Sequence, residues 1–133
     1  QVDQLGLTSQ ITLTGPKNED SLFVEYAQAH TLVLPSKNEV WGLVVNEALA
    51  SGLHVVVSDQ CGVAQDVADM QGVFVCGVSE TELAHTMQLS SNEWNGPISE
   101  PQIVKIIPGE YGKAFLDALK FSYAEKNNLS RRQ

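Results

Sequence analysis

Two glutamates, Glu39 and Glu47, have seven residues between them in the stretch "PSKNEVWGLVVNEALASG". This stretch begins with residues typical of a loop and continues as an apolar helix, so Glu47 has almost only apolar neighbours. Burying a charge there is costly unless it is paired or hydrogen-bonded, which favours a carboxylate that serves a ligand. The alternatives are a solvated helix position for Glu47, and a loop surface charge or helix-capping charge for Glu39.

The helix expected after Glu39 offers an anion site. Its first turn, near Trp41, Gly42 and Leu43, exposes backbone N–H groups, and Gly42 lets a ligand approach the backbone closely. These groups and the helix dipole favour phosphate, and a diphosphate fits best. Glu47, about one and a half turns further on, can accept hydrogen bonds from a ribose diol, while Glu39 can reach the group that the diphosphate carries.

The elements that position these residues follow from apolar patterning. Runs rich in β-branched residues predict strands over residues 10–15, 30–36, 53–59 and 72–77, and helix-like segments lie at 19–29, 42–51, 63–69 and 79–89. This alternation predicts a mainly parallel sheet covered by helices on both faces. A long loop over 90–109 and a last amphipathic helix over 110–126 follow.

Boundary residues support these elements. Asn18 or Asp20 can cap the first helix, and Gly52 stands where a helix end favours a left-handed residue. Ser79, three residues before Glu82, predicts a capping box.

Composition limits the classes of protein to which this chain can belong. The 133 residues, 43% hydrophobic, fit a single domain over 1–133. A net charge of -8 argues against nonspecific nucleic-acid binding. Apolar runs are too short to span a bilayer, so a cytoplasmic location is expected. Cys61 and Cys76 are expected to be reduced thiols, and no residues have metal-ligand spacing.

The segments "ITLTG" and "YAQAHTLVLPSKNEVWGLVVNEALASGLHVVVSDQCG" resemble the donor-binding half of group 1 retaining glycosyltransferases with the GT-B fold. The resemblance covers roughly residues 5–76, and "PSxxExxGLxxxEAxAxG" is its most specific part. It implies an α/β, Rossmann-like domain that forms the C-terminal half of a GT-B enzyme. The implied reaction transfers a sugar, with retention, from a nucleotide-diphosphate sugar, and no cofactor or metal is implied.

The resemblance also implies roles for individual residues. Glu39 matches the glutamate that contacts the donor sugar and is the expected catalytic residue, and Glu47 matches the one that binds the ribose. The remaining expected donor-binding residues are Gly42, Leu43 and Val44 at the helix start, and Gly15 and Pro16 in the loop after the first strand.

The sequence departs from the family pattern. Cys61 and Gln65 replace a glycine and a glutamate of the family's turn, and Lys17 and Lys37 are not obvious substitutes for its basic pair. The first two strands of the family's sheet and the acceptor domain are absent. We therefore expect either a rearranged sheet or, preferably, an incomplete domain that works with an N-terminal acceptor domain or the remainder of a longer chain. Any peripheral membrane contact would belong to that full enzyme.

Other interpretations stay open at this point. A noncatalytic nucleotide-binding or interaction module of the same fold is the main alternative. A receiver-type signalling domain is disfavoured, because "LVLPS" ends in serine where that class needs an aspartate. If Glu47 were a solvated helix residue, Asn46 would lie beside it on the exposed face; His54 is expected in a structural role. Trp41 is expected to pack under the helix more readily than to border the sugar, and Asp59 either faces a ligand or caps a turn.

Overall fold

The computed structural model describes residues 1–106, apart from the side chain of Glu19. The elements in order are α1 (Glu19–Gln28), β1 (Thr31–Leu34), α2 (Leu43–Ala50), β2 (His54–Ser58), α3 (Ala64–Val67), β3 (Val73–Cys76), α4 (Glu80–Glu93) and the 3₁₀ helix η1 (Gln102–Lys105). The helix expected over 110–126 lies outside the described residues.

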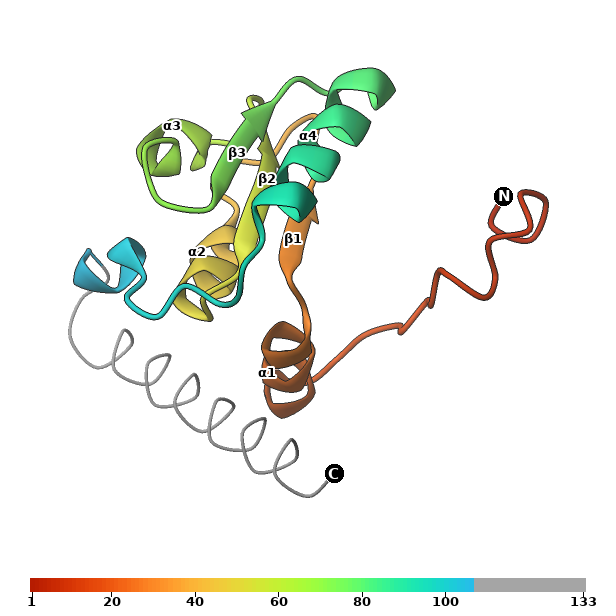
Figure 1. Cartoon of the computed structure of the whole chain (residues 1–133), viewed down its shortest axis with the longest axis horizontal. Coiled ribbons are helices and arrows are strands. Elements are labelled where there is room, and N and C mark those ends of the chain that lie inside the picture. The colour runs from red at the N-terminus through yellow and green to blue at the C-terminus, as the bar shows by residue number, and fades with distance from the viewer. Residues whose placement is uncertain (107–133) are drawn as a thin grey trace.

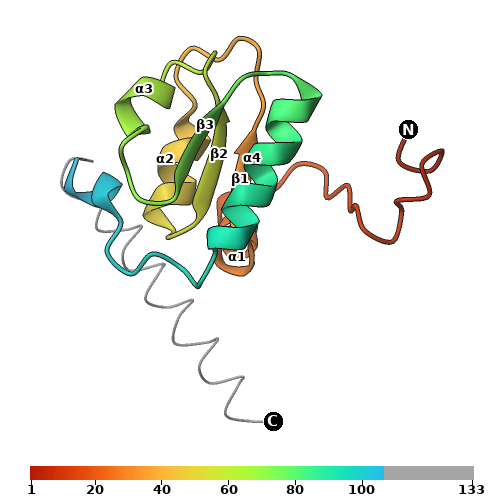
Figure 2. The same cartoon turned by 45° about the horizontal axis from the view of Figure 1, so that its top comes forward.

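The described strands form one parallel sheet in the order β1-β2-β3. The central strand β2 is buried along its whole length, because α2 covers one face of the sheet and α4 the other (Figures 1 and 2). A strand enclosed in this way needs apolar residues at successive positions, which explains the continuous run "HVVVS". The expected α/β, Rossmann-like fold with a parallel sheet between helices is confirmed.

The strand expected over residues 10–15 is wrong. This segment belongs to an exposed arm that runs away from the sheet before α1 (Figure 1), and the side chain of Leu13 is 86% exposed. A β-strand requires a hydrogen-bonded neighbour, and the sheet formed by the described residues reaches only as far as β1 on this side. The apolar pattern is therefore present without the partner that would make it a strand.

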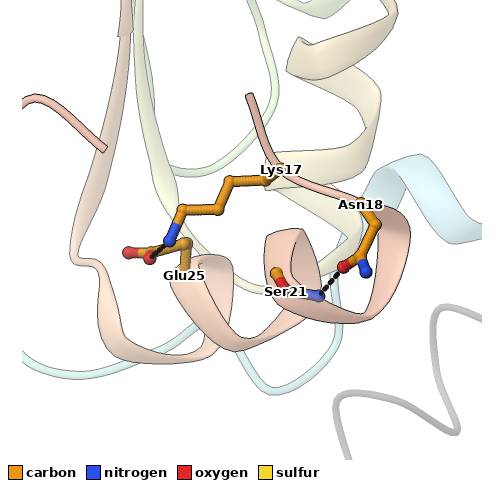
Figure 3. A network of polar contacts seen from close by, with 4 residues as sticks. All are labelled: Lys17, Asn18, Ser21 and Glu25. Carbon is orange, nitrogen blue, oxygen red and sulfur yellow. Dashed lines mark hydrogen bonds and ion pairs between the residues drawn. The ribbon is translucent and has the colours of Figure 1, made fainter. Parts of the chain in front are cut away.

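Helix ends follow the expected signals. The Asn18 side chain caps α1 by accepting a hydrogen bond of 2.9 Å from the Ser21 N–H (Figure 3). The Ser79 hydroxyl caps α4 by accepting from the Glu82 N–H at 3.3 Å, so the expected N-terminal cap is confirmed. Gly52 follows α2 with φ +79°, the left-handed conformation expected there.

The fourth helix is longer than its sequence indicates. It was expected to end at residue 89, but α4 continues to Glu93, and η1 lies within the expected loop. The polar letters "SSNE" suggested a loop, yet Ser90 is fully buried and its hydroxyl lies 2.9 Å from the Thr31 hydroxyl. This contact with β1 holds the last turn of α4 against the sheet.

Candidate functional site

The loop after β1 is joined by backbone hydrogen bonds to the turn after β2. Glu39 forms an isolated parallel bridge with Cys61, and the Gly62 N–H donates to the Glu39 carbonyl at 2.9 Å. The next residue after Gly62, Val63, donates its N–H to the Trp41 carbonyl at 3.0 Å. These bonds fix the backbone of Glu39 at the carboxyl edge of the sheet, where open parallel sheets bind ligands.

Gly42 brings the Glu39 side chain beside the start of α2. Gly42 has φ +88°, a conformation that side-chain-bearing residues rarely adopt. A Cβ on Gly42 would lie 3.2 Å from Val63 Cγ1 and 3.6 Å from Glu39 Cγ. A glycine is therefore required for the turn, and it leaves the Glu39 side chain next to the N-terminus of α2.

The start of α2 differs from the starts of α1 and α4. Those two helices have Asn18 and Ser79 as side-chain caps, whereas α2 has Gly42, with no side-chain capping bond and no acidic residue in its first turn. The first N–H groups of a helix have no intrahelical acceptor. At Leu43 and Val44 these groups are therefore suited to an anion, and both residues are exposed.

Glu47 lies further along α2 and is half-buried. Its Oε2 accepts a hydrogen bond of 3.0 Å from the Tyr26 hydroxyl, a contact that the sequence analysis did not identify. Tyr26 belongs to α1, and its side chain is only 6% exposed. Burial and the neighbouring Glu47 carboxylate raise the pKa of the Tyr26 phenol well above its usual range, so the phenol remains a hydrogen-bond donor.

Gly15 and Pro16 lie in the exposed arm, apart from the elements that form this site. No described atom lies within 4 Å of the position that a Gly15 Cβ would take. Next to them, Lys17 forms an ion pair of 2.7 Å with Glu25 of α1 (Figure 3). The Lys17 side chain is thereby directed toward α1.

Neighbouring residues refine the sequence-based expectations. Asn46 is not on an exposed face: it is half-buried, and its Oδ1 is buried with no hydrogen-bond partner among the described residues. Trp41 is 51% exposed, so it is not packed under the helix as expected. Asp59 is exposed at the carboxyl edge and accepts from Gln60 Nε2 at 2.9 Å. His54 is buried, with Nδ1 3.2 Å from the Ser90 carbonyl, as expected of a structural residue.

Ser58 ties the site loop to the end of β2. Its hydroxyl donates to the Ser36 carbonyl and accepts from the Gln60 N–H at 3.2 Å, and the residue is 1% exposed. We expect Ser58→Ala to lower the free energy of unfolding by about 1–3 kcal/mol, because the Ser36 carbonyl loses its buried donor. Urea unfolding measures this, with exposed Ser99→Ala as the control. Equal midpoints for the two variants would contradict this role.

Cys76, at the end of β3, is a buried free thiol. Burial raises its pKa, a hydrogen bond with Thr86 acts in the opposite direction, and the Glu82 and Asp59 carboxylates raise the pKa further. We expect iodoacetamide to label Cys76 slowly at pH 7.5, with acceleration only above the pH at which an unfolded thiol ionises. The same raised pKa gives a contribution to stability that is present below the unfolded pKa and lost as the pH rises through the folded value. Mass spectrometry of the labelled peptide measures the labelling rate, with the urea-unfolded chain as control. Fast labelling of Cys76 in the folded protein at neutral pH would contradict the labelling prediction.

Within residues 1–106, no helix is long and apolar enough to cross a membrane. The same residues contain no group of three His, Cys, Asp or Glu side chains suited to a metal ion.

Comparisons with known proteins show the family of this chain. Residues 1–96 match the sequence profile of the glycosyl transferases group 1. The chain is 32% identical over 122 residues to a D-inositol 3-phosphate glycosyltransferase of Mycolicibacterium gilvum, covering 91% of this chain and 25% of that protein. It is 34% identical over 86 residues to the enzyme of the same name from Mycobacterium sp. (strain KMS), covering 64% of this chain and 20% of that protein.

A solved structure shows the same fold. Sucrose-phosphate synthase from Thermosynechococcus elongatus aligns with a TM-score of 0.64 and 24% identity, over 98% of this chain and 32% of that one. The chain thus spans a quarter or less of the two glycosyltransferases it resembles and about a third of the synthase. Because the family profile matches most of its length, this chain belongs to the group 1 glycosyl transferases.

Proposed function

We propose that this chain binds the nucleotide-diphosphate sugar of a retaining glycosyltransferase, and that the full-length protein transfers the sugar to an acceptor held by its other domain. The observation that carries this proposal is the arrangement on α2. Its start has no side-chain cap, the Glu39 side chain lies beside Gly42 at that start, and Glu47 stands further along the same helix.

Each part of the donor has a matching group. The N–H groups of Leu43 and Val44 are suited to the diphosphate, whose charge grows as it leaves. Glu47 has acceptor oxygens for the ribose diol, and the proposal gives Glu39 the role of the catalytic residue of this half, accepting hydrogen bonds from the sugar hydroxyls. In the reaction the bond from the sugar C1 to the diphosphate oxygen breaks, a bond from C1 to the acceptor oxygen forms on the same face, and the acceptor proton passes to the leaving phosphate. No cofactor beyond the donor is part of the proposal.

Exposed apolar residues at the same edge support a partner domain. Val40 is 89% exposed and Leu43 53%, and both lie next to the proposed donor site. Apolar groups exposed side by side are typical of surfaces that another domain or a ligand covers. We propose that the acceptor domain of the full-length protein faces this edge. We also propose a cytoplasmic location, since two free buried thiols fit a reducing compartment.

An amide chemical-shift titration of the 133-residue chain tests the donor site. The ligands are the 5′-diphosphates of uridine, guanosine and adenosine, with the matching monophosphates as controls for the diphosphate contact. We expect one diphosphate to shift the resonances of Gly42 to Glu47 more strongly than its monophosphate. Well-dispersed resonances that none of the three diphosphates moves would refute the donor site.

A further inference from the structure

We propose that Tyr26 is a positioning residue for the ribose-binding carboxylate: its hydroxyl holds Glu47 in the orientation that presents the second carboxylate oxygen to the ribose. This inference rests on the proposed function, in which Glu47 accepts the ribose hydroxyls. It assigns a specific task to a residue of α1, a helix that lies outside the strand-loop-helix stretch in which the expected site residues are concentrated.

The contact joins two elements that are distant in sequence. The Tyr26 hydroxyl donates to Glu47 Oε2 at 3.0 Å, across a separation of 21 residues. An ionised carboxylate only accepts hydrogen bonds and offers about four lone-pair positions over its two oxygens. One phenol bond to Oε2 therefore leaves Oε1 with its acceptor capacity for a ribose hydroxyl.

Packing fixes the position of the phenol. The Tyr26 side chain is 6% exposed and belongs to the core cluster that also contains Ala48 and Leu49 of α2. A tyrosine ring has two side-chain torsions, and burial in a packed core restricts both. The core therefore places the hydroxyl, and the hydroxyl in turn restricts the half-buried Glu47. Without it, Glu47 would adopt several rotamers, and binding the ribose would have to select one of them.

The test compares Tyr26→Phe with the unaltered 133-residue chain. This variant keeps the buried ring and removes only the donor. Dissociation constants are measured for the nucleoside diphosphate that binds most tightly in the titration above and for its 2′-deoxy and 3′-deoxy analogues. We expect Tyr26→Phe to weaken binding of the ribonucleotide by about 3- to 10-fold, the range for one hydrogen bond, and to leave binding of the deoxy analogues nearly unchanged.

A control separates positioning from general loss of packing. Ser90→Ala removes a fully buried hydroxyl on α4, which bonds to Thr31 rather than to the site. We expect it to lower stability without changing the ratio of ribose to deoxyribose affinity. A second measurement covers the case in which Tyr26→Phe does not fold. The ¹³Cζ resonance of Tyr26 in the unaltered chain should move on binding the ribonucleotide and stay in place with the deoxy analogues.

The outcomes distinguish the two proposals. If the unaltered chain discriminates ribose from deoxyribose and Tyr26→Phe discriminates equally well, the positioning role is overturned and the donor site stands. A ¹³Cζ resonance that does not respond to the ribonucleotide overturns it in the same way. If the unaltered chain binds no nucleoside diphosphate, the proposed function fails and this inference fails with it.

Discussion

Replacing Glu47 is expected to weaken nucleotide binding by about 1–3 kcal/mol, which is roughly a 5- to 150-fold rise in the dissociation constant. The reason is the loss of hydrogen bonds between a charged acceptor and the two ribose hydroxyls. Glu47→Gln is the better variant than Glu47→Ala, because the amide oxygen can still accept the bond from the Tyr26 hydroxyl. Glu47→Ala would leave that buried hydroxyl without a partner and would mix loss of stability with loss of binding.

Isothermal titration with a ribonucleotide and its deoxyribose analogue measures this effect. The deoxy analogue should lose little further affinity in Glu47→Gln, because the contact that distinguishes the two sugars is already gone. Glu25→Gln is the matched control: it alters an exposed glutamate of α1 whose ion pair with Lys17 is worth at most about 1 kcal/mol. A Glu47→Gln chain that still prefers ribose as strongly as the unaltered chain would show that Glu47 does not bind the ribose.

Gly62→Ala is expected to have the largest effect on stability, about 3 kcal/mol. A Cβ at this position would lie 2.0 Å from the Val40 carbonyl oxygen, and a backbone atom cannot turn aside as a flexible side chain can. The loop after β1 and the turn after β2 must then separate, which strains the core by about 1–3 kcal/mol and weakens the bond from the Gly62 N–H to the Glu39 carbonyl by about 1 kcal/mol.

Gly77→Ala is a matched comparison for this prediction. Its Cβ would also meet an atom closely, at 2.6 Å, but that atom is the carboxyl end of Glu82, which can rotate away. Urea unfolding should therefore show a much lower midpoint for Gly62→Ala than for Gly77→Ala. Because Glu39 moves with the loop, Gly62→Ala should also bind the donor more weakly. Similar midpoints for the two variants would mean that the loop and the turn yield easily and do not fix Glu39.

The sequence predicted well those parts of the fold that depend on local pattern. The run "LHVVV" indicated a strand enclosed on both faces, and β2 is that strand. Asn18, Gly52 and Ser79 marked helix ends because capping is a property of a few consecutive residues. The prediction of a strand over 10–15 was wrong because a strand needs a hydrogen-bonded partner, which the residues of the segment itself do not specify.

The site likewise combines features that follow from local sequence with contacts between distant segments. The spacing of Glu39 and Glu47 around Gly42 indicated a candidate site from the sequence alone, because a helix start and a helix face follow from consecutive residues. The sequence did not predict the bond from Tyr26 to Glu47 or the close approach of Gly62 to Val40. Each contact depends on how segments about twenty residues apart pack together. A buried tyrosine and a glycine at a turn have many structural uses, and their types alone do not indicate which residue they meet.

The order of strands in the sheet has a consequence for how the protein is made. β1, β2 and β3 lie side by side in the order in which they are translated, and the pairs Thr31 with His54 and Val55 with Val73 join residues only about one βα unit apart. These separations limit the entropy cost of closing each loop, because that cost rises with the number of residues in the loop. Pairing can therefore begin once β2 has left the ribosome, with each new strand docking on one already in place.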